Sequence, residues 1–80
     1  MNAIEVTASL RLAILDKIPD AVVDVQPGSG GHYSIQVTSP VFSGKSMLES
    51  QRLVYGAIAH LMKGNDAPVH AVDKLTTKTP

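Results

Sequence analysis

The sequence predicts an α+β fold, a single αββαβ domain in which two helices cover one face of a three-stranded sheet. Apolar residues recur at helical spacing in two segments. Alternating or β-branched residues mark three further segments, and a glycine-rich run separates the first two of these. The chain has 80 residues, 44% of them hydrophobic and 18% charged, which suits one small domain over residues 1–80.

The first helix is predicted over residues 3–17. Its apolar residues recur at every fourth position and form one stripe: Val6, Leu10, Ile14 and Ile18. Asn2 is placed to cap the helix, with Glu5 three residues later in a capping box. Pro19 ends the helix, because its ring disfavours the α conformation at the preceding residue.

Two strands are predicted next, over residues 21–26 and 32–39. Valines dominate the first strand, and apolar and polar residues alternate in the second. One face of the second strand is therefore apolar: Tyr33, Ile35 and Val37. The connection contains Gly28, Gly30 and Gly31, which favour a mobile hairpin loop. We call residues 28–31 the glycine loop.

A second helix is predicted over residues 46–62, preceded by a short helical turn near residues 41–45. Ser46 and Glu49 have the spacing of a capping box, and Gly64 suits a left-handed C-cap. Phe42, the sole Phe of the chain, is expected to anchor the turn in the core. The predicted core stripe is Leu48, Tyr55, Ala59 and Met62, flanked by Val54, Ile58 and Leu61.

The third strand is predicted over residues 69–75, with residues 76–80 frayed. Asp73 and Lys74 interrupt its apolar pattern. The register after Val72 is therefore open, and a β-bulge fits this position.

Composition excludes several classes of function. Seven Lys and Arg balance seven Asp and Glu, which argues against a strongly electrostatic DNA binder. The absence of cysteine excludes a disulfide framework and a self-contained thiolate metal site. No apolar stretch reaches membrane-spanning length, and the first residues lack the basic cluster of a signal peptide. A cytoplasmic protein without membrane association is expected.

Catalytic motifs are lacking. Gly44, Lys45 and Ser46 resemble the end of a phosphate-binding loop, but Ser39 stands where that motif requires its first glycine. A turn followed by a capped helix is the preferred interpretation. No serine lies in a nucleophile-elbow context, and no HExxH motif occurs. The sequence therefore predicts that the chain is not an enzyme.

Histidines are the candidate metal ligands. His32 follows the glycine loop and His70 opens the third strand, so both would approach one sheet edge if that strand pairs beside the hairpin. Two neutral imidazoles suit zinc, copper or iron but are too few for a closed site. His60, within the second helix, is expected to face solvent.

Four short motifs stand at the turn before the second helix, within that helix, at the third strand and at the end of the chain: FSGKS (residues 42–46), RLVY (52–55), VHAV (69–72) and KTP (78–80). With IPDA at residues 18–21, they resemble the BolA-like family over nearly the whole chain, from Met1 to Pro80. The resemblance implies an αββαβ domain similar to class II KH folds.

The resemblance also implies a partner and a cofactor. BolA-like proteins typically pair with a monothiol glutaredoxin and share a two-iron two-sulfur cluster with it. The cluster is held by a glutaredoxin cysteine, by glutathione and by BolA-side residues. His70 matches the family's histidine before alanine, and His32 is the one residue here that can fill the loop role. No cofactor is expected in the isolated chain.

An alternative function is DNA binding in transcriptional, stress or morphology regulation, through Lys45 and Arg52 and the KH-like shape. Many members have Arg-His before the last arginine of the second helix, where this chain has Ser50 and Gln51, which weakens this alternative. The usual KH GxxG loop is also absent. These departures suggest a subgroup with a short glycine loop. An exposed strand edge also allows a homodimer.

Overall fold

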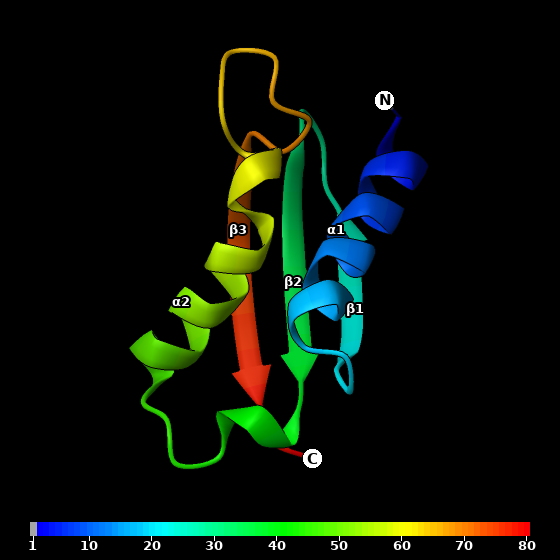
Figure 1. Ribbon diagram of the computed structural model, residues 1–80. Coiled ribbons are helices and arrows are strands. Elements are labelled where there is room, and N and C mark those ends of the chain that lie inside the picture. Colours follow the sequence, from blue (N-terminus) through cyan, green and yellow to red (C-terminus); the bar gives the residue numbers. More distant parts are fainter. Residues whose placement is uncertain (1) are drawn as a thin grey trace.

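The computed structural model describes residues 2–80, so Met1, the first residue of the predicted domain, lies outside the described residues. The elements follow in the order α1 (Ala3–Lys17), β1 (Val22–Pro27), β2 (His32–Thr38), α2 (Met47–Ile58) and β3 (Ala71–Lys78). Both helices lie on one face of the sheet (Figure 1). The predicted αββαβ order and layering are confirmed.

Helix α1 forms as the sequence predicts. The Asn2 side chain accepts a hydrogen bond from the Glu5 backbone N–H, and the Glu5 side chain accepts one from the Asn2 backbone, which completes the capping box. Every member of the predicted apolar stripe is buried: Val6, Leu10, Ile14 and Ile18. The helix therefore lies flat on the sheet along one continuous apolar face.

The sheet has the order β1-β2-β3. Strands β1 and β2 are antiparallel, and β2 and β3 are parallel. Tyr33 pairs with Val72, but Ser34 pairs with Lys74, so Asp73 is an extra residue at this point. The register that the sequence left open after Val72 is therefore interrupted by a bulge.

The predicted bounds of the third strand are wrong. Strand β3 begins at Ala71, not at residue 69, and continues to Lys78. Thr76, Thr77 and Lys78 pair with the end of β2, and the Ser39 N–H donates to the Lys78 carbonyl at 3.0 Å. These residues do not fray, because β-branched threonines find a partner strand with free hydrogen-bonding groups.

The predicted core stripe of the second helix is wrong at three of its four positions, while the flanking Val54 and Ile58 are fully buried and Met62 packs against the core half-buried. Leu48 and Tyr55 are 55% and 38% exposed, and Ala59 is exposed as well. The buried residues of α2 are Ser50, Val54, Ala57 and Ile58. Leu48 and Tyr55 form one apolar stripe of this helix, and Val54 and Ile58 form a second one beside it. Neighbouring residues of a helix point about 100° apart, so the choice between the two stripes changes the buried face. The helix ends at Ile58 and a 3₁₀ turn, Ala59–Leu61, follows it.

The turn before α2 is a 3₁₀ helix, Pro40–Phe42, which begins slightly earlier than the predicted short turn. Ser39 caps it, and its buried hydroxyl accepts from the Val41 N–H at 3.1 Å and donates to Asp20 Oδ1 at 3.0 Å. Phe42 is 5% exposed and anchors the turn, as predicted.

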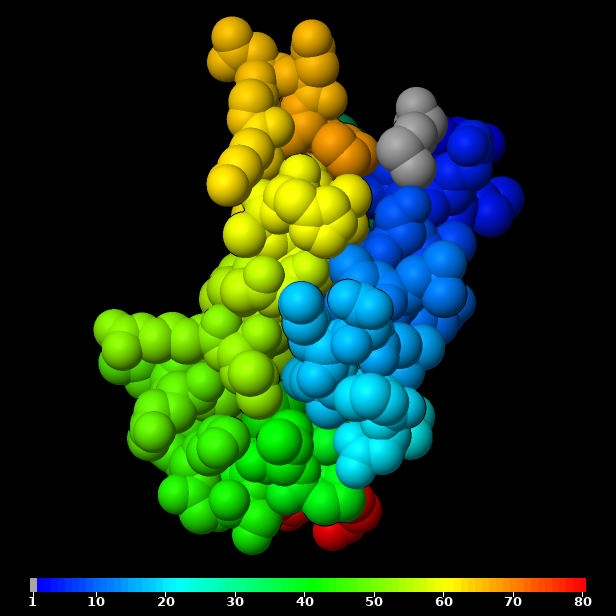
Figure 2. Space-filling view, viewed as in Figure 1, coloured from blue at the N-terminus to red at the C-terminus, as the bar shows by residue number. Residues whose placement is uncertain are grey.

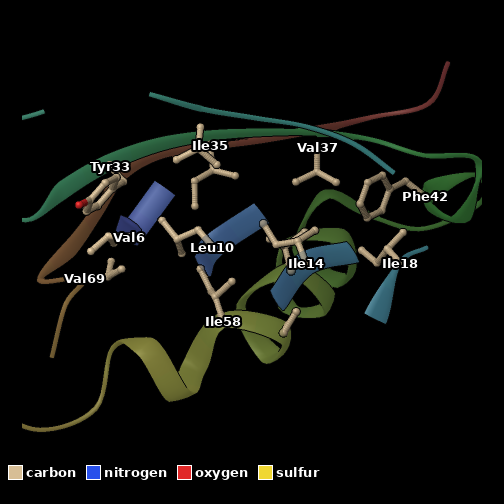
Figure 3. Close-up of a cluster of buried hydrophobic side chains, with 13 residues drawn as sticks. Val6, Leu10, Ile14, Ile18, Tyr33, Ile35, Val37, Phe42, Ile58 and Val69 are labelled. Atoms are coloured by element: carbon tan, nitrogen blue, oxygen red, sulfur yellow. The ribbon is translucent and has the colours of Figure 1, made fainter. Parts of the chain in front are cut away.

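Side chains from both helices and the sheet form the core (Figure 3). Leu10, Ile14, Val37 and Ile58 are all fully buried. Tyr33 and Val69 close the core at the end of the sheet where β2 begins. Within residues 2–80, no helix is both long and apolar enough to cross a bilayer.

Candidate functional site

The glycine loop closes the β1–β2 hairpin in a tight, hydrogen-bonded turn. The Gly28 N–H donates to the His32 carbonyl at 2.8 Å, and the His32 N–H donates to the Ser29 carbonyl at 3.3 Å. Gly30 and Gly31 have φ values of 67° and 80°, in the left-handed region that favours glycine. The loop lies at the same end of the molecule as the segment that leads from α2 to β3 (Figure 1).

The backbone of the glycine loop holds His70 in place. The Gly31 carbonyl accepts from the His70 N–H at 2.9 Å and from the Ala71 N–H at 3.3 Å. A Cβ atom at Gly31 would lie 3.0 Å from His70 Cγ, so the imidazole packs directly on the glycine backbone. The His70 ring can take this position because Gly31 has no side chain.

His70 borders a surface cleft of about 440 Å³. The cleft lies between the glycine loop, the start of α1 and the segment before β3, and its lining includes Val6, Tyr33, Asp66 and Pro68. The His70 side chain is exposed. None of the side-chain hydrogen bonds within residues 2–80 involves the His70 ring. The Gly31 backbone thus supports one side of the imidazole, and the ring remains exposed to solvent.

His32 has a different environment. Alternation along β2 places it on the face away from the helices, since its neighbour Tyr33 is buried under them. Its Nδ1 lies 2.8 Å from Asp73 Oδ1, and the side chains are 45% and 56% exposed. His32 is absent from the lining of the His70 cleft.

The structure brings both histidines to the glycine loop, from different sides. A Cβ atom at Gly30 would lie 3.9 Å from His32 Cδ2, while Gly31 carries the His70 ring. Within the described part of the chain, no group of three or more His, Cys, Asp or Glu side chains is arranged to hold a metal ion.

Asp73 lies beside His32, and the sequence alone does not predict this contact. In the sequence, Asp73 stands out only as an interruption of the apolar pattern of the third strand. A charged residue within a strand that pairs beside a histidine was the available signal. Its contact with His32 depends on the parallel pairing of β2 with β3, which joins residues 41 positions apart.

The other candidate residues lie elsewhere. Lys45 precedes α2 and Arg52 lies on it, and both are exposed. The turn before α2 is at the opposite end of the sheet from the glycine loop (Figure 1). His60 is exposed, as expected, and borders a groove between α1 and α2, which lie side by side in Figure 2.

The GKS segment forms a capped helix start, as predicted. The Ser46 hydroxyl accepts from the Glu49 N–H, and Glu49 Oε1 accepts from the Ser46 N–H, both at 3.1 Å. Hydrogen bonds from the Ser46 backbone and hydroxyl lower the pKa of Glu49, and the Lys45 ammonium acts in the same direction. The Glu49 carboxylate thus accepts from the Ser46 N–H and places a negative charge at the start of the helix, which disfavours a bound anion there.

Comparison with known proteins gives a consistent result. The family model for BolA, described as BolA-like protein, matches residues 8–80. Protein BOLA2 of Arabidopsis thaliana is 34% identical over 76 residues, which cover 95% of this chain and 76% of the relative. BolA-like protein 1 of Homo sapiens is 41% identical over 56 residues, which cover 70% of this chain but 38% of the human protein.

Solved structures show the same fold. A bolA protein homologue from Coxiella burnetii superposes with a TM-score of 0.74 at 31% identity, over 92% of this chain and 90% of that one. The order and packing of two helices on a three-stranded mixed sheet, together with the sequence match, lead to one conclusion. This chain belongs to the BolA-like protein family.

Proposed function

We propose that this chain is a non-enzymatic adaptor that pairs with a monothiol glutaredoxin and co-ligates a shared two-iron two-sulfur cluster in iron–sulfur trafficking or sensing. His70 is the principal ligand from this chain and His32 is the second. The observation that carries the proposal is the exposed His70 imidazole, fixed by the Gly31 backbone and left without a protein partner within residues 2–80.

The donor set of the chain fits half of such a cluster site. An imidazole is a good ligand for iron, and two are present at one end of the sheet. The chain has no cysteine, so it supplies no thiolate. A two-iron cluster needs four protein or cofactor ligands. The remaining two are the glutaredoxin cysteine and the glutathione thiolate.

The choice of imidazole has a chemical consequence. Replacing an anionic thiolate by a neutral imidazole makes the cluster less negative, which raises its reduction potential. When bound, the cluster supplies one-electron redox chemistry and a visible chromophore. The glycine loop of this chain orients His70, and the cleft beside it is where the partner would dock.

Titration with a cluster-loaded monothiol glutaredoxin tests the proposal. Addition of this chain is expected to change the visible circular dichroism of the cluster and to give a heterocomplex on gel filtration. In His70→Ala, both the spectral change and the affinity should be lost or strongly reduced. An unchanged spectrum with the unmodified chain, or an unchanged response in His70→Ala, would contradict the proposal.

Duplex DNA and self-association are the competing outcomes. If Lys45 and Arg52 bind phosphates, duplex retardation should weaken steeply as salt is raised, because phosphate contacts release counterions. Analytical ultracentrifugation of the chain alone shows whether the exposed strand edges support a homodimer. Salt-sensitive DNA binding without a response to glutaredoxin would favour the regulatory function instead.

A further inference from the structure

The contact between His32 and Asp73 joins the proposed second ligand to the bulge of β3. His32 Nδ1 lies 2.8 Å from Asp73 Oδ1, a distance typical of a charge-assisted hydrogen bond. Asp73 is the residue that the bulge adds to β3. The two side chains are about half exposed, so their meeting is not forced by burial in the core.

We propose that Asp73 is a positioning residue that holds the Nδ1 edge of His32 and so leaves its Nε2 free as the ligand atom for the cluster. This inference rests on the proposed function. An ionised carboxylate only accepts hydrogen bonds, so a neutral His32 that bonds to it carries its proton on Nδ1. Nε2 then has the free lone pair that a metal requires.

The orientation of the His32 ring agrees with this tautomer. A Cβ atom at Gly30 would lie 3.9 Å from His32 Cδ2, the carbon bonded to Nε2. The Cδ2 edge of the ring is therefore next to Gly30, and the Nδ1 edge is turned to Asp73. The neighbouring Gly31 holds His70, so the two imidazoles lie against adjacent glycines of the same loop.

The bulge explains why Asp73 can reach His32. Ala71 pairs with His32, and in an unbroken ladder the residue two positions later would sit opposite Ser34. Lys74 occupies that place instead, so the extra residue, Asp73, is free of pairing. Its carboxylate turns back along the strand to His32. Bulges next to functional sites commonly direct a side chain in this way.

The first test uses the isolated chain and needs no glutaredoxin. Long-range ¹H–¹⁵N NMR at a pH of about 9, where ordinary imidazoles are neutral, reports the tautomer of His32. We expect the Nδ1–H form in the unmodified chain and a shift towards the Nε2–H form in Asp73→Ala. A His32 that holds its proton on Nε2 in the unmodified chain would overturn the inference.

The second test uses the heterocomplex. Asp73→Ala is expected to weaken formation of the shared cluster by about 10–100-fold, the usual effect of removing a carboxylate behind a metal-bound histidine. In Asp73→Asn, cluster formation should be weakened less than in Asp73→Ala, because the amide oxygen still accepts a hydrogen bond from Nδ1–H. Asp24→Ala is the matched control, since Asp24 is an exposed strand aspartate whose carboxylate accepts from Gln26 and not from a histidine.

Two failures can be distinguished. If the unmodified chain forms the cluster complex and Asp73→Ala matches Asp24→Ala in spectrum and affinity, the role of Asp73 is wrong and the adaptor function stands. If the unmodified chain leaves the glutaredoxin spectrum unchanged, the adaptor function and this inference fail together. Tighter cluster binding in Asp73→Ala would also overturn the inference, because it would mean that Asp73 holds His32 away from the cluster.

Discussion

The core of this small domain and its histidine-bearing end are ordered by different interactions. Under α1, the chain buries branched apolar side chains such as Leu10 and Ile14 completely. At the glycine loop, it uses residues without side chains, and backbone hydrogen bonds place an exposed His70. The core is stabilised by buried apolar area, whereas backbone hydrogen bonds and glycine geometry position the histidine.

This difference has a consequence for function. The net stability of a small domain is only about 5–15 kcal/mol, so a functional substitution in the core can unfold it. Here the proposed ligands lie outside the core, and substitutions there should change chemistry with little cost in stability. Four experiments test that separation, from the largest expected effect on stability to the smallest.

Ile14→Ala should have the largest effect, because Ile14 is fully buried on α1. The lost burial and the remaining cavity are expected to lower the free energy of unfolding by about 2–5 kcal/mol. Urea denaturation measures this change. Leu12→Ala, at a 67% exposed position of the same helix, should stay within about 0.5 kcal/mol of the parent chain. Similar losses in both variants would contradict the proposed position of the core.

Gly31→Ala tests whether backbone geometry alone orders the histidine end. Gly31 and Gly44 both have left-handed φ values, 80° and 77°, so alanine at either should cost about 1–2 kcal/mol. A Cβ at Gly31 would additionally press on His70 at 3.0 Å, whereas one at Gly44 meets nothing within 4 Å.

Gly31→Ala should therefore shift the His70 ring resonances and weaken cluster formation, and Gly44→Ala should do neither. Urea denaturation together with NMR of the imidazole separates the shared backbone cost from the specific contact. If both variants leave His70 unchanged, the loop does not orient the imidazole.

Ser39→Ala tests a polar contact of the core. The Ser39 hydroxyl donates to Asp20 and accepts from the Val41 N–H. Because Ser39 is fully buried, its removal leaves those partners without a bond and should cost about 1–2 kcal/mol. Ser43→Ala, at an exposed position in the same turn, is the control and should be nearly neutral. Equal midpoints of thermal unfolding for the two variants would contradict this assignment.

The smallest effect concerns pH. Hydrogen bonds from Ser46 lower the pKa of Glu49 in the folded chain, so its stabilising contribution is present above the ordinary glutamate pKa. That contribution is lost as the pH falls through the lowered value. Between about pH 5 and pH 3, the parent chain should therefore lose more stability than Glu49→Gln. Urea midpoints measured across this range would contradict the assignment if the two curves are parallel.

Local sequence signals predicted much of the fold. Helix α1 matches its predicted residues, because a regular stripe, a capping box and Pro19 all agree. Helix α2 was assigned the wrong buried face, since Val54 and Ile58 compete with Leu48 and Tyr55 at the same spacing and only packing against α1 and the sheet decides between them. The end of β3 was missed because its pairing with β2 is a long-range contact.

The site was predicted in part. His32 and His70 were brought together on topology, and the structure places both at the glycine loop. The two histidines approach the loop from different sides, which depends on the strand register. The support of His70 by Gly31 depends on the φ value of that glycine. Neither can be derived from the sequence composition. The Asp73 contact required the bulge to be located to a single residue.

Direct detection of an imidazole from this chain on the cluster tests the adaptor function. The chain is labelled with ¹⁵N-histidine and combined with an unlabelled monothiol glutaredoxin that carries the cluster, and the reduced complex is measured by pulsed electron paramagnetic resonance. We expect ¹⁵N hyperfine couplings in the parent chain and in His60→Ala, with a coupling lost in His70→Ala. A complex that shows no ¹⁵N coupling, or the same couplings in His70→Ala, would contradict the ligand role of this chain.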